Sequence, residues 1–338
     1  MNVGSSLRSF VKRSKWALIA YTALRSSFVR FKFSMGRIDS FAGSTHLRVS
    51  PAESVAYINR QFDDYFRYGK LSLEELGGKR VLEGGPGDNL GLALRFLVCG
   101  AKQVVTMDKF YARRDSEQQR RIYLALREQF NEEQRRIYDR AIDLSSGIVF
   151  NEAMLKPIYG KGMEECGDVL EEGSFDFIIS RVVIQEIFDT DRVFIGMDKV
   201  LRRGGKMLHK IDLRDYGTFS SNGHHPLTFL TIPDPVYTLM SRNAGRPGRK
   251  TFGYYRKKVL EFGYQADLYV TAVVNWGYPK PPIEVIPHKT ELVPGVDYDD
   301  KNLELVRSIR PHLAKRFRHL SDEDLMATGL FLIACKPA

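Results

Sequence analysis

Apolar and polar positions alternate in short blocks along the chain, most regularly between residues 79 and 110. Apolar runs at 79–85 and 102–110 are typical of buried strands, and the segment between them, 90–100, has helical spacing and ends at Gly100. A strand, a helix and a second strand joined by short turns form a βαβ unit, which predicts a parallel sheet.

The same pattern continues towards the C-terminus. We predict a weak third strand at 147–153, and further strands at 174–187, 206–213, 264–274 and 327–337. An amphipathic helix at 191–205 would stop at a pair of glycines. These segments predict an α/β fold of the Rossmann-like type, with a mostly parallel seven-stranded sheet and helices on both faces.

Two further helices have capping signals. For the helix at 50–69, Ser50 is the predicted N-cap, Pro51 fits the first helical position and Glu53 completes a capping box. Residues 113–143 are charged and helical in pattern, with Ser116 and Gln119 as a second capping box.

We interpret the chain as one domain, residues 50–338, preceded by a basic arm, residues 1–49. Two insertions of the domain, about 213–255 and 277–320, are expected on the side of the substrate; the second begins with a stretch, 277–295, that holds five prolines and must be mostly loop. The three scattered cysteines have no metal-ligand spacing, so we expect no metal site and a reducing compartment, the cytoplasm.

The arm carries most of the positive charge. Its first forty residues hold eight basic side chains and one acidic one, a net +7 of the total +10. Its apolar stretch at 16–24 is too short to cross a bilayer, which needs about 20 residues. Two interpretations are open: an ordinary helix packed on the domain, and an amphipathic segment in peripheral contact with an anionic membrane.

A glycine-rich turn follows the first strand. The order Glu83-Gly84-Gly85-Pro86-Gly87 is typical of a loop that brings backbone close to a nucleotide. A nicotinamide dinucleotide site requires another small residue where this chain has Leu90. Asp108 ends the next strand, and one interpretation is that it caps a following helix.

These motifs, in this order and at these separations, resemble class I S-adenosylmethionine-dependent methyltransferases over about residues 70–215. The segments 209–217 and 319–337 further resemble bacterial methyltransferases linked to polysaccharide, envelope or small-molecule biosynthesis. The resemblance implies S-adenosylmethionine as the cofactor and Asp108 as the carboxylate that binds its ribose. It also implies cofactor contacts for the two glycines of the turn and for strand-end residues, namely Glu83, Gly85, Gly87, Asn89, Asp108, Ser180 and Arg181.

Candidates for the catalytic group lie after the fifth strand, where open α/β sheets place ligands. They are His209, Asp212 and His225. Imidazole titrates near neutrality, which suits a general base. The alternatives are that His209 is a core histidine and that Asp212 forms a local ion pair with Arg214. Downstream, Arg242, Arg246, Arg249 and Lys250 would suit an acidic acceptor or a solvated basic loop.

We therefore predict methyl transfer to a small-molecule or glycan acceptor. Nucleic acid is not the predicted partner, because residues 180–183 lack the proline pair of amino-group base methylases and no cysteine follows a proline. RNA and protein methyltransferases remain alternatives, as does a non-catalytic protein on the same scaffold that binds membranes or nucleic acid.

Overall fold

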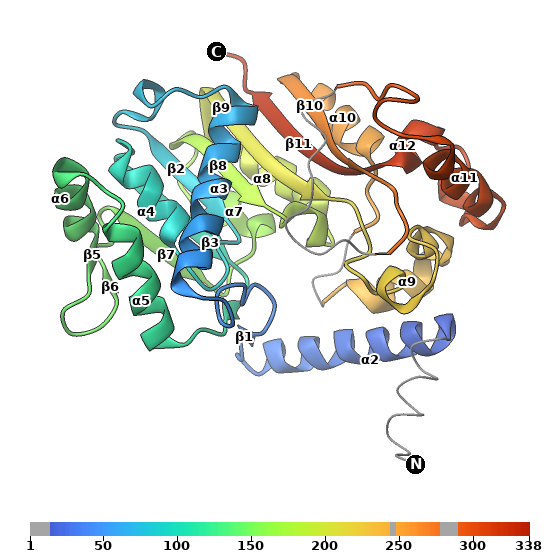
Figure 1. Ribbon diagram of the computed structural model, residues 1–338, viewed down its shortest axis with the longest axis horizontal. Helices are drawn as coiled ribbons and strands as arrows, with labels where there is room; N and C mark the ends of the chain where they lie inside the picture. The colour runs from blue at the N-terminus through green and yellow to red at the C-terminus, as the bar shows by residue number, and fades with distance from the viewer. Residues whose placement is uncertain (1–13, 244–247, 278–289) are drawn as a thin grey trace.

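One seven-stranded sheet organises the chain in the computed structural model, which describes residues 14–243, 248–277 and 290–338 (Figure 1). The strand order is β10-β11-β9-β8-β2-β3-β7, and only β11 runs against the others. The predicted α/β class and the mostly parallel seven-stranded sheet are confirmed. The strands are β2 (Arg80–Gly84), β3 (Gln103–Asp108), β7 (Leu155–Tyr159), β8 (Phe175–Arg181), β9 (Leu201–Asp212), β10 (Gln265–Val273) and β11 (Ala327–Cys335).

Helices cover both faces of this sheet, as predicted. Successive strand residues point to opposite faces, so Val81 belongs to one apolar cluster and Leu82 to the other. The first cluster includes side chains of α3 (Pro51–Gly69), α4 (Gly91–Val98), α5 (Ser116–Arg127) and α6 (Glu132–Ala141); α3 and α4 cross in front of the sheet in Figure 1. The second includes α7 (Cys166–Val169), α8 (Thr190–Val200) and α10 (Phe252–Glu261).

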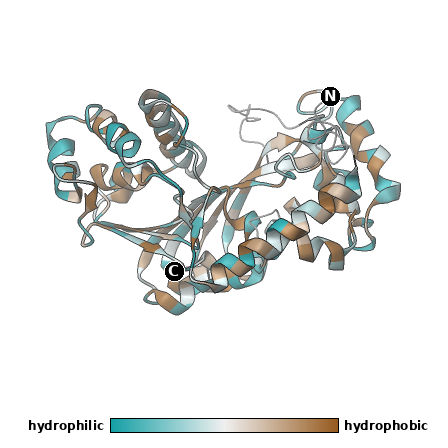
Figure 2. Ribbon diagram, turned by 90° about the horizontal axis from the view of Figure 1, so that it is seen from below, coloured by the Kyte–Doolittle hydropathy of each residue, from teal (hydrophilic) through white to brown (hydrophobic). Residues whose placement is uncertain are grey.

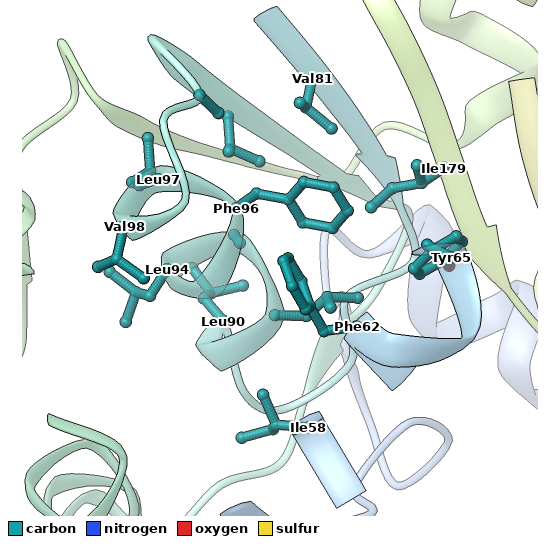
Figure 3. Packing of buried hydrophobic residues seen from close by; sticks show 14 of the residues in the cluster. Ile58, Phe62, Tyr65, Val81, Leu90, Leu94, Phe96, Leu97, Val98 and Ile179 are labelled. Atoms are coloured by element: carbon teal, nitrogen blue, oxygen red, sulfur yellow. The ribbon is translucent and has the colours of Figure 1, made fainter. Parts of the chain in front are cut away.

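Aromatic packing fixes α3 and α4 against each other. Phe62 of α3 and Phe96 of α4 meet edge to face, with ring centroids 5.1 Å apart, and both are buried. Figure 3 shows these two rings packed among the strand residues Val81 and Ile179 and the helix residues Ile58 and Leu94. Because α4 begins directly after the glycine turn, this packing also holds the turn in place.

The capping signals are confirmed at the first predicted helix and corrected at the second. Ser50 and Glu53 form the predicted capping box at the start of α3. At α5 the N-cap is Asp115, whose side chain accepts from the backbone N–H of Gln118, so the prediction of Ser116 was wrong by one residue. The region predicted as one helical stretch contains two helices, because Asn131 starts α6 with a capping box of its own.

The predicted third strand at 147–153 was wrong. Only Val149–Phe150 form a strand there, β6, and it pairs with β5 (Ile142–Asp143) outside the main sheet. The third position is taken by β7, which includes Lys156 and Pro157. A proline is tolerated at the edge of a sheet, and a half-exposed edge strand lacks a continuous apolar pattern.

The remaining elements form a third cluster beside the sheet. In it, α2 (Lys15–Ser34) packs on α9 (Asp234–Ser241), near α11 (Asp300–Ile309) and α12 (Asp322–Met326). A short pair, β1 (Asp39–Ser40) with β4 (Tyr111–Ala112), ties the chain after α2 to the end of β3. Single turns of 3-10 helix are η1 (Glu74–Leu76), η2 (Met163–Glu165), η3 (Ile184–Glu186), η4 (Ser220–Asn222), η5 (Thr228–Thr231), η6 (Arg310–His312) and η7 (Lys315–Phe317).

Much of the proline-rich segment, residues 278–289, lies outside the described residues. Among the helices that the structure describes, none has the length and apolarity needed to cross a membrane.

Candidate functional site

A pocket of about 620 Å³ opens at the carboxyl ends of β2, β3 and β8. After β2 the chain continues to β3 and β7 on one side, and then returns to β8 on the other side of β2. Such a switch point leaves a crevice between the strand ends, which is where open α/β sheets bind their ligands. The volume is in the usual range for small-molecule and cofactor sites.

The glycine turn forms one wall of this pocket. Gly85 and Gly87 have φ angles of +66° and +73°, which side chains rarely adopt. A Cβ at Gly85 would lie 2.3 Å from a methyl carbon of Val183, and one at Gly87 would lie 2.7 Å from the carbonyl oxygen of Gly43. Both positions therefore require glycine because other parts of the chain approach the turn closely.

Glu83 lies beneath the turn and lines the pocket. Its side chain is 5% exposed, and its Oε2 has no hydrogen-bond partner among the described residues. Burial, helped by the negative charge of Asp108, raises the pKa of Glu83 to about 8. A buried carboxylate of this kind is stabilised by a cation in the pocket.

Asp108 lines the same pocket from the end of β3. Its Oδ1 accepts from the backbone N–H of Phe110 at 3.0 Å, and burial raises the pKa of the carboxyl to about 6. The alternative role as a helix cap is not seen, because the short strand β4 follows and Asp115 caps the next helix. Asp108 is thus positioned to receive hydrogen bonds from a ligand.

Asn89 lines the pocket and organises the end of the turn. Its Oδ1 accepts from the backbone N–H of Gly91 at 2.7 Å, and its Nδ2 donates to Oε1 of Gln119 at 2.6 Å. The side chain is buried. Asn89 therefore fixes the first turn of α4 on α5.

Ser180 and Arg181, the last two residues of β8, point in different directions. Arg181 lines the pocket and donates from NH1 to Oδ2 of Asp64 on α3 at 2.6 Å. Ser180 is absent from the lining: its hydroxyl pairs with Nδ1 of His209 at 2.8 Å. The alternation of side chains along a strand explains this difference.

The catalytic candidates of β9 are buried in the sheet layer. Neither His209 nor Asp212 lines the pocket. Burial lowers the pKa of His209 to about 3, so its ring is neutral around pH 7. The carboxylate of Asp212 accepts twice from the guanidinium of Arg214, at 2.8 and 2.6 Å, which confirms the alternative of a local ion pair.

His225 also lies outside the pocket lining. Its Nδ1 accepts from the backbone N–H of Leu227 at 3.0 Å, so Nε2 carries the proton and donates to the carbonyl of Leu305 at 2.9 Å. Both ring nitrogens are thus used to join two loops. The assignment of His209, Asp212 or His225 as a catalytic residue stays a prediction, and the pocket places none of them at its wall.

Sequence reasoning missed a strap over the glycine turn, formed by residues 42–46. Its Gly43 accepts from the backbone N–H of Asp88 at 3.0 Å, and both carboxylate oxygens of Asp88 accept from the N–H of His46. Four strap residues line the pocket: Ala42, Gly43, Thr45 and His46. No motif in the sequence indicates such a long-range contact.

The far side of the pocket carries charged side chains. Glu186, which the sequence did not single out, and Phe188 follow β8. The exposed Arg242, one of the predicted basic residues, follows α9, with its guanidinium 5.9 Å from the ring of Phe188. Of the other predicted basic residues, Arg249 is buried on carbonyl groups of the third cluster and Lys250 lies over Tyr254. Arg246 lies outside the described residues.

The sequence prediction named Glu83, Gly85, Gly87, Asn89, Asp108 and Arg181 as cofactor contacts, and the structure brings these six to one pocket. Within residues 14–243, 248–277 and 290–338 no group of three His, Cys, Asp or Glu side chains could hold a metal ion.

Comparisons with known proteins show similarity of fold at low identity. No model of a known protein family matches the chain, and no curated protein matches it. Among solved structures, phosphoethanolamine N-methyltransferase 2 of Haemonchus contortus, in complex with S-adenosyl-L-methionine, is 16% identical, with a TM-score of 0.41 over 84% of this chain. This chain covers 56% of that one.

Two further solved structures have the same level of similarity. A methyltransferase of Mesorhizobium loti, described as S-adenosylmethionine-dependent, is 14% identical over 82% of this chain and 100% of its own, with a TM-score of 0.39. The [4+2]-cyclase SpnF is 15% identical over 83% of this chain and 81% of its own, also with a TM-score of 0.39.

Proposed function

We propose that this chain is an S-adenosylmethionine-dependent methyltransferase that acts on a small-molecule or glycan acceptor. The observation that carries the proposal is the pair of carboxyl groups, Glu83 and Asp108, at the ends of neighbouring parallel strands on either side of a glycine turn. A buried carboxylate oxygen without a partner matches a cationic ligand, and S-adenosylmethionine carries both an ammonium and a sulfonium group.

Bound in this pocket, the cofactor would supply a methyl group made electrophilic by its sulfonium. The ionised carboxylate of Glu83 would hold the cationic end of the ligand. Asp108 would accept hydrogen bonds from ribose hydroxyls, the role that the resemblance gives to the acid at this strand end. Gly85 and Gly87 would keep the backbone close to the ligand, and the strap at 42–46 would exclude water from it.

The acceptor would lie on the far side of the pocket, beside Arg181, Glu186 and Arg242. Two guanidinium groups and a carboxyl group suit a polar acceptor, and a sugar or a sugar phosphate offers hydroxyl and anionic oxygens to such groups. Glu186 lies at the pocket wall, so we infer that it is better placed than His209 or His225 to take a proton from an acceptor hydroxyl.

Calorimetry tests the cofactor assignment. We expect S-adenosylmethionine and S-adenosylhomocysteine to bind and NAD to give no heat. Asp108→Ala should weaken binding by at least roughly tenfold, because it removes one charge-assisted hydrogen bond or more. Asp139→Ala, which removes a carboxylate far from the pocket on α6, is the matched control and should bind normally. Binding of NAD in place of S-adenosylmethionine would refute the proposal.

Transfer of a labelled methyl group tests the acceptor. The protein, labelled S-adenosylmethionine and fractions of cell extract are incubated, and the labelled product is identified by its mass. Label in a small molecule or glycan supports the proposal, whereas label only in RNA or only in protein would establish one of the alternatives. The membrane contact predicted for residues 1–49 is a separate proposal from the acceptor, although the strap at 42–46 belongs both to this arm and to the pocket wall.

A further inference from the structure

Helix α2 has a continuous row of exposed apolar side chains. Tyr21, Leu24, Phe28, Phe31 and Met35 follow each other at intervals of three and four residues, which places them on one side of the helix. Each is between 49% and 72% exposed. We call these five residues the outer row. An exposed apolar stripe of this length on a soluble domain marks an interaction surface.

The opposite side of α2 is already used by the fold. Leu18, Ile19, Thr22 and Ser26 are buried, and Leu18 and Ile19 pack in the cluster that includes Tyr237 of α9. Lys15 also donates to the hydroxyl of Thr231 at 2.6 Å. Packing on the domain therefore explains one face of α2 and leaves the outer row unexplained.

The position of α2 makes the outer row accessible. The helix runs along the lower edge of the molecule in Figure 1, beneath α9. In the view from below it crosses the front of the molecule, and hydrophobic colour recurs along it (Figure 2). A 20-residue helix is about 30 Å long, so the surface could rest on a flat partner over its whole length.

The charge around the outer row is mostly positive, with Lys32 paired to Asp39 at 3.1 Å. Residues 1–38 contain eight Lys and Arg and no Asp or Glu. On and directly after α2, Arg25, Arg30 and Arg37 are exposed and form no ion pair with the acidic residues that the structure describes. Arg25 and Lys32 lie beside the row on the same flank, about two turns apart.

We propose that α2 is a membrane-docking helix, whose outer row enters the surface of an anionic bilayer while the flanking basic residues bind lipid phosphates. Aromatic and aliphatic side chains on one face with Lys and Arg beside them are the composition of helices that lie in the interface of a bilayer. Basic residues near an anionic surface add about 1 kcal/mol each. No helix in the described part of the chain could span a bilayer, and the proposed contact is with the bilayer surface.

A second copy of the chain is the competing occupant, because the spacing of the outer row also suits two packed helices. Helix pairs of that kind carry complementary charges beside the apolar row. Here Arg25 flanks the row, Lys32 is paired with Asp39, and α2 contains no acidic residue, so a second copy would bring like charges together. An anionic lipid surface complements the same charges.

The docking surface is connected to the pocket through the chain. The strap at 42–46 follows α2 after a few residues, and Arg242, which follows α9, also lines the pocket. Docking through α2 would therefore hold the edge of the pocket formed by the strap close to the bilayer. The inference does not depend on the reaction at the pocket, since it rests on α2 alone.

Co-sedimentation with lipid vesicles tests the proposal. We expect the full chain to bind vesicles of phosphatidylcholine mixed with phosphatidylserine, to bind pure phosphatidylcholine much more weakly, and to be released by salt. Leu24→Ser with Phe28→Ser should weaken binding by at least roughly tenfold. Arg25→Gln with Arg30→Gln should weaken it by roughly 30-fold, two charges at about 1 kcal/mol each.

Matched variants on other surfaces control for composition. Ile195→Ser with Leu260→Ser removes two side chains that are 60% and 68% exposed on α8 and α10, and Lys102→Gln with Lys156→Gln removes two exposed charges. Both should bind vesicles as the unsubstituted chain does. Retained calorimetric binding at the pocket would show that the α2 variants are folded.

Three outcomes would overturn the proposal: equal binding to neutral and anionic vesicles, equal loss in the control variants, and no binding to any vesicle. A dimer in analytical ultracentrifugation that Leu24→Ser with Phe28→Ser dissociates would assign the outer row to a second copy instead.

Discussion

Glu83 and Asp108 occupy the carboxyl ends of neighbouring parallel strands, and the negative charge of Asp108 adds to burial in raising the pKa of Glu83. The two groups titrate in different windows, since their pKa values are about 8 and about 6. Without a ligand, two carboxyl groups in one buried site oppose each other, and a cation between strand and turn would relieve both.

Glu83 should contribute a decrease in the stability of the free protein as the pH rises. Glu83 has a folded-state pKa of about 8 against an ordinary value of 4.5, so between these values the folded state binds more protons than the unfolded state. The free energy of unfolding must then decrease with increasing pH in this window. Glu83→Gln should remove the decrease between about pH 6 and 8, as measured by urea unfolding at several pH values.

The same series has an internal control in Asp108→Asn. The pKa of Asp108 is raised from 3.8 to about 6, so this variant should remove the decrease in the free energy of unfolding at lower pH. It should also shift the decrease caused by Glu83 to lower pH, because the charge of Asp108 raises the pKa of Glu83. The affinity for a cationic ligand should change with pH in the opposite direction to the stability. It should rise towards pH 8 in the unsubstituted protein and stay constant in Glu83→Gln. Parallel curves for all three proteins would contradict the coupling.

Gly87→Ala should disrupt the strap as well as the turn. The added Cβ would lie 2.7 Å from the carbonyl oxygen of Gly43, in a backbone conformation with φ of +73°. Gly78 has nearly the same φ, +70°, but no atom within 4 Å of its Cβ position. Gly78→Ala should therefore cost only the conformational strain, roughly 1–2 kcal/mol.

The comparison separates strain from collision. We expect Gly87→Ala to lose more stability than Gly78→Ala and, in addition, to make residues 42–46 accessible to a protease. Chemical denaturation and limited proteolysis measure the two effects. Similar losses in both variants, with the strap still protected, would mean that the contact between Gly43 and Gly87 contributes nothing.

Local patterns in the sequence were sufficient for the centre of the site. Val81 is buried on one face of the sheet and Leu82 on the other, so β2 is recognisable as a continuous apolar run. The glycines after this run predict a turn. Strand ends on one edge of a parallel sheet converge, which brings Glu83, Asp108 and Arg181 together without any knowledge of tertiary contacts. The same argument misplaced Ser180 because it ignored which way each side chain of β8 points.

Contacts between distant segments could not be derived in that way. Gly43 approaches Gly87 across the turn, and His225 joins Leu227 to Leu305; neither pair has a periodic or spacing signal. The edge strand β7 lacks an apolar run, so the third strand was predicted at 147–153. Gly162, Met163 and Glu164, which follow β7 and line the pocket, were therefore not singled out. Val182 has a φ of +58°, a backbone conformation that is rare for a β-branched residue and that the sequence therefore could not predict.

Asp64→Asn should destabilise the protein more than the removal of a comparable surface carboxylate. Asp64 neutralises Arg181, and both side chains are about one-fifth exposed. Removing one member of a largely buried pair leaves an uncompensated charge, at a cost of about 3 kcal/mol. The matched variant Asp139→Asn breaks a bidentate pair with Arg127 that is 30% and 50% exposed, and should cost less than about 1 kcal/mol.

Urea unfolding at one pH gives both values. Asp64→Asn should also weaken cofactor binding, because Arg181 lines the pocket and would move. Asp139→Asn should bind the cofactor normally. Equal costs for the two variants would mean that the pair between Asp64 and Arg181 is solvated enough to behave as a surface pair.

Substitution of His209 distinguishes a structural from a catalytic role. His209 is fully buried, pairs with Ser180 and does not line the pocket. We therefore expect His209→Gln to lower the free energy of unfolding by roughly 1–3 kcal/mol, the cost of an unsatisfied buried partner. Ser180→Ala should couple to it in a double-mutant cycle, by about 0.5–3 kcal/mol. The methyl-transfer rate of the folded variant should change by less than about threefold.

A general base at this position would give a different result. Its removal would lower the rate by roughly a hundredfold or more, because positioned proton transfer contributes about 10²–10⁴. The pKa of His209 is lowered to about 3 by burial, so the pH profile of the unsubstituted protein should show no step from this residue between pH 5 and 8. A rate loss of that size in a folded His209→Gln, with unchanged cofactor affinity, would establish His209 as the catalytic group.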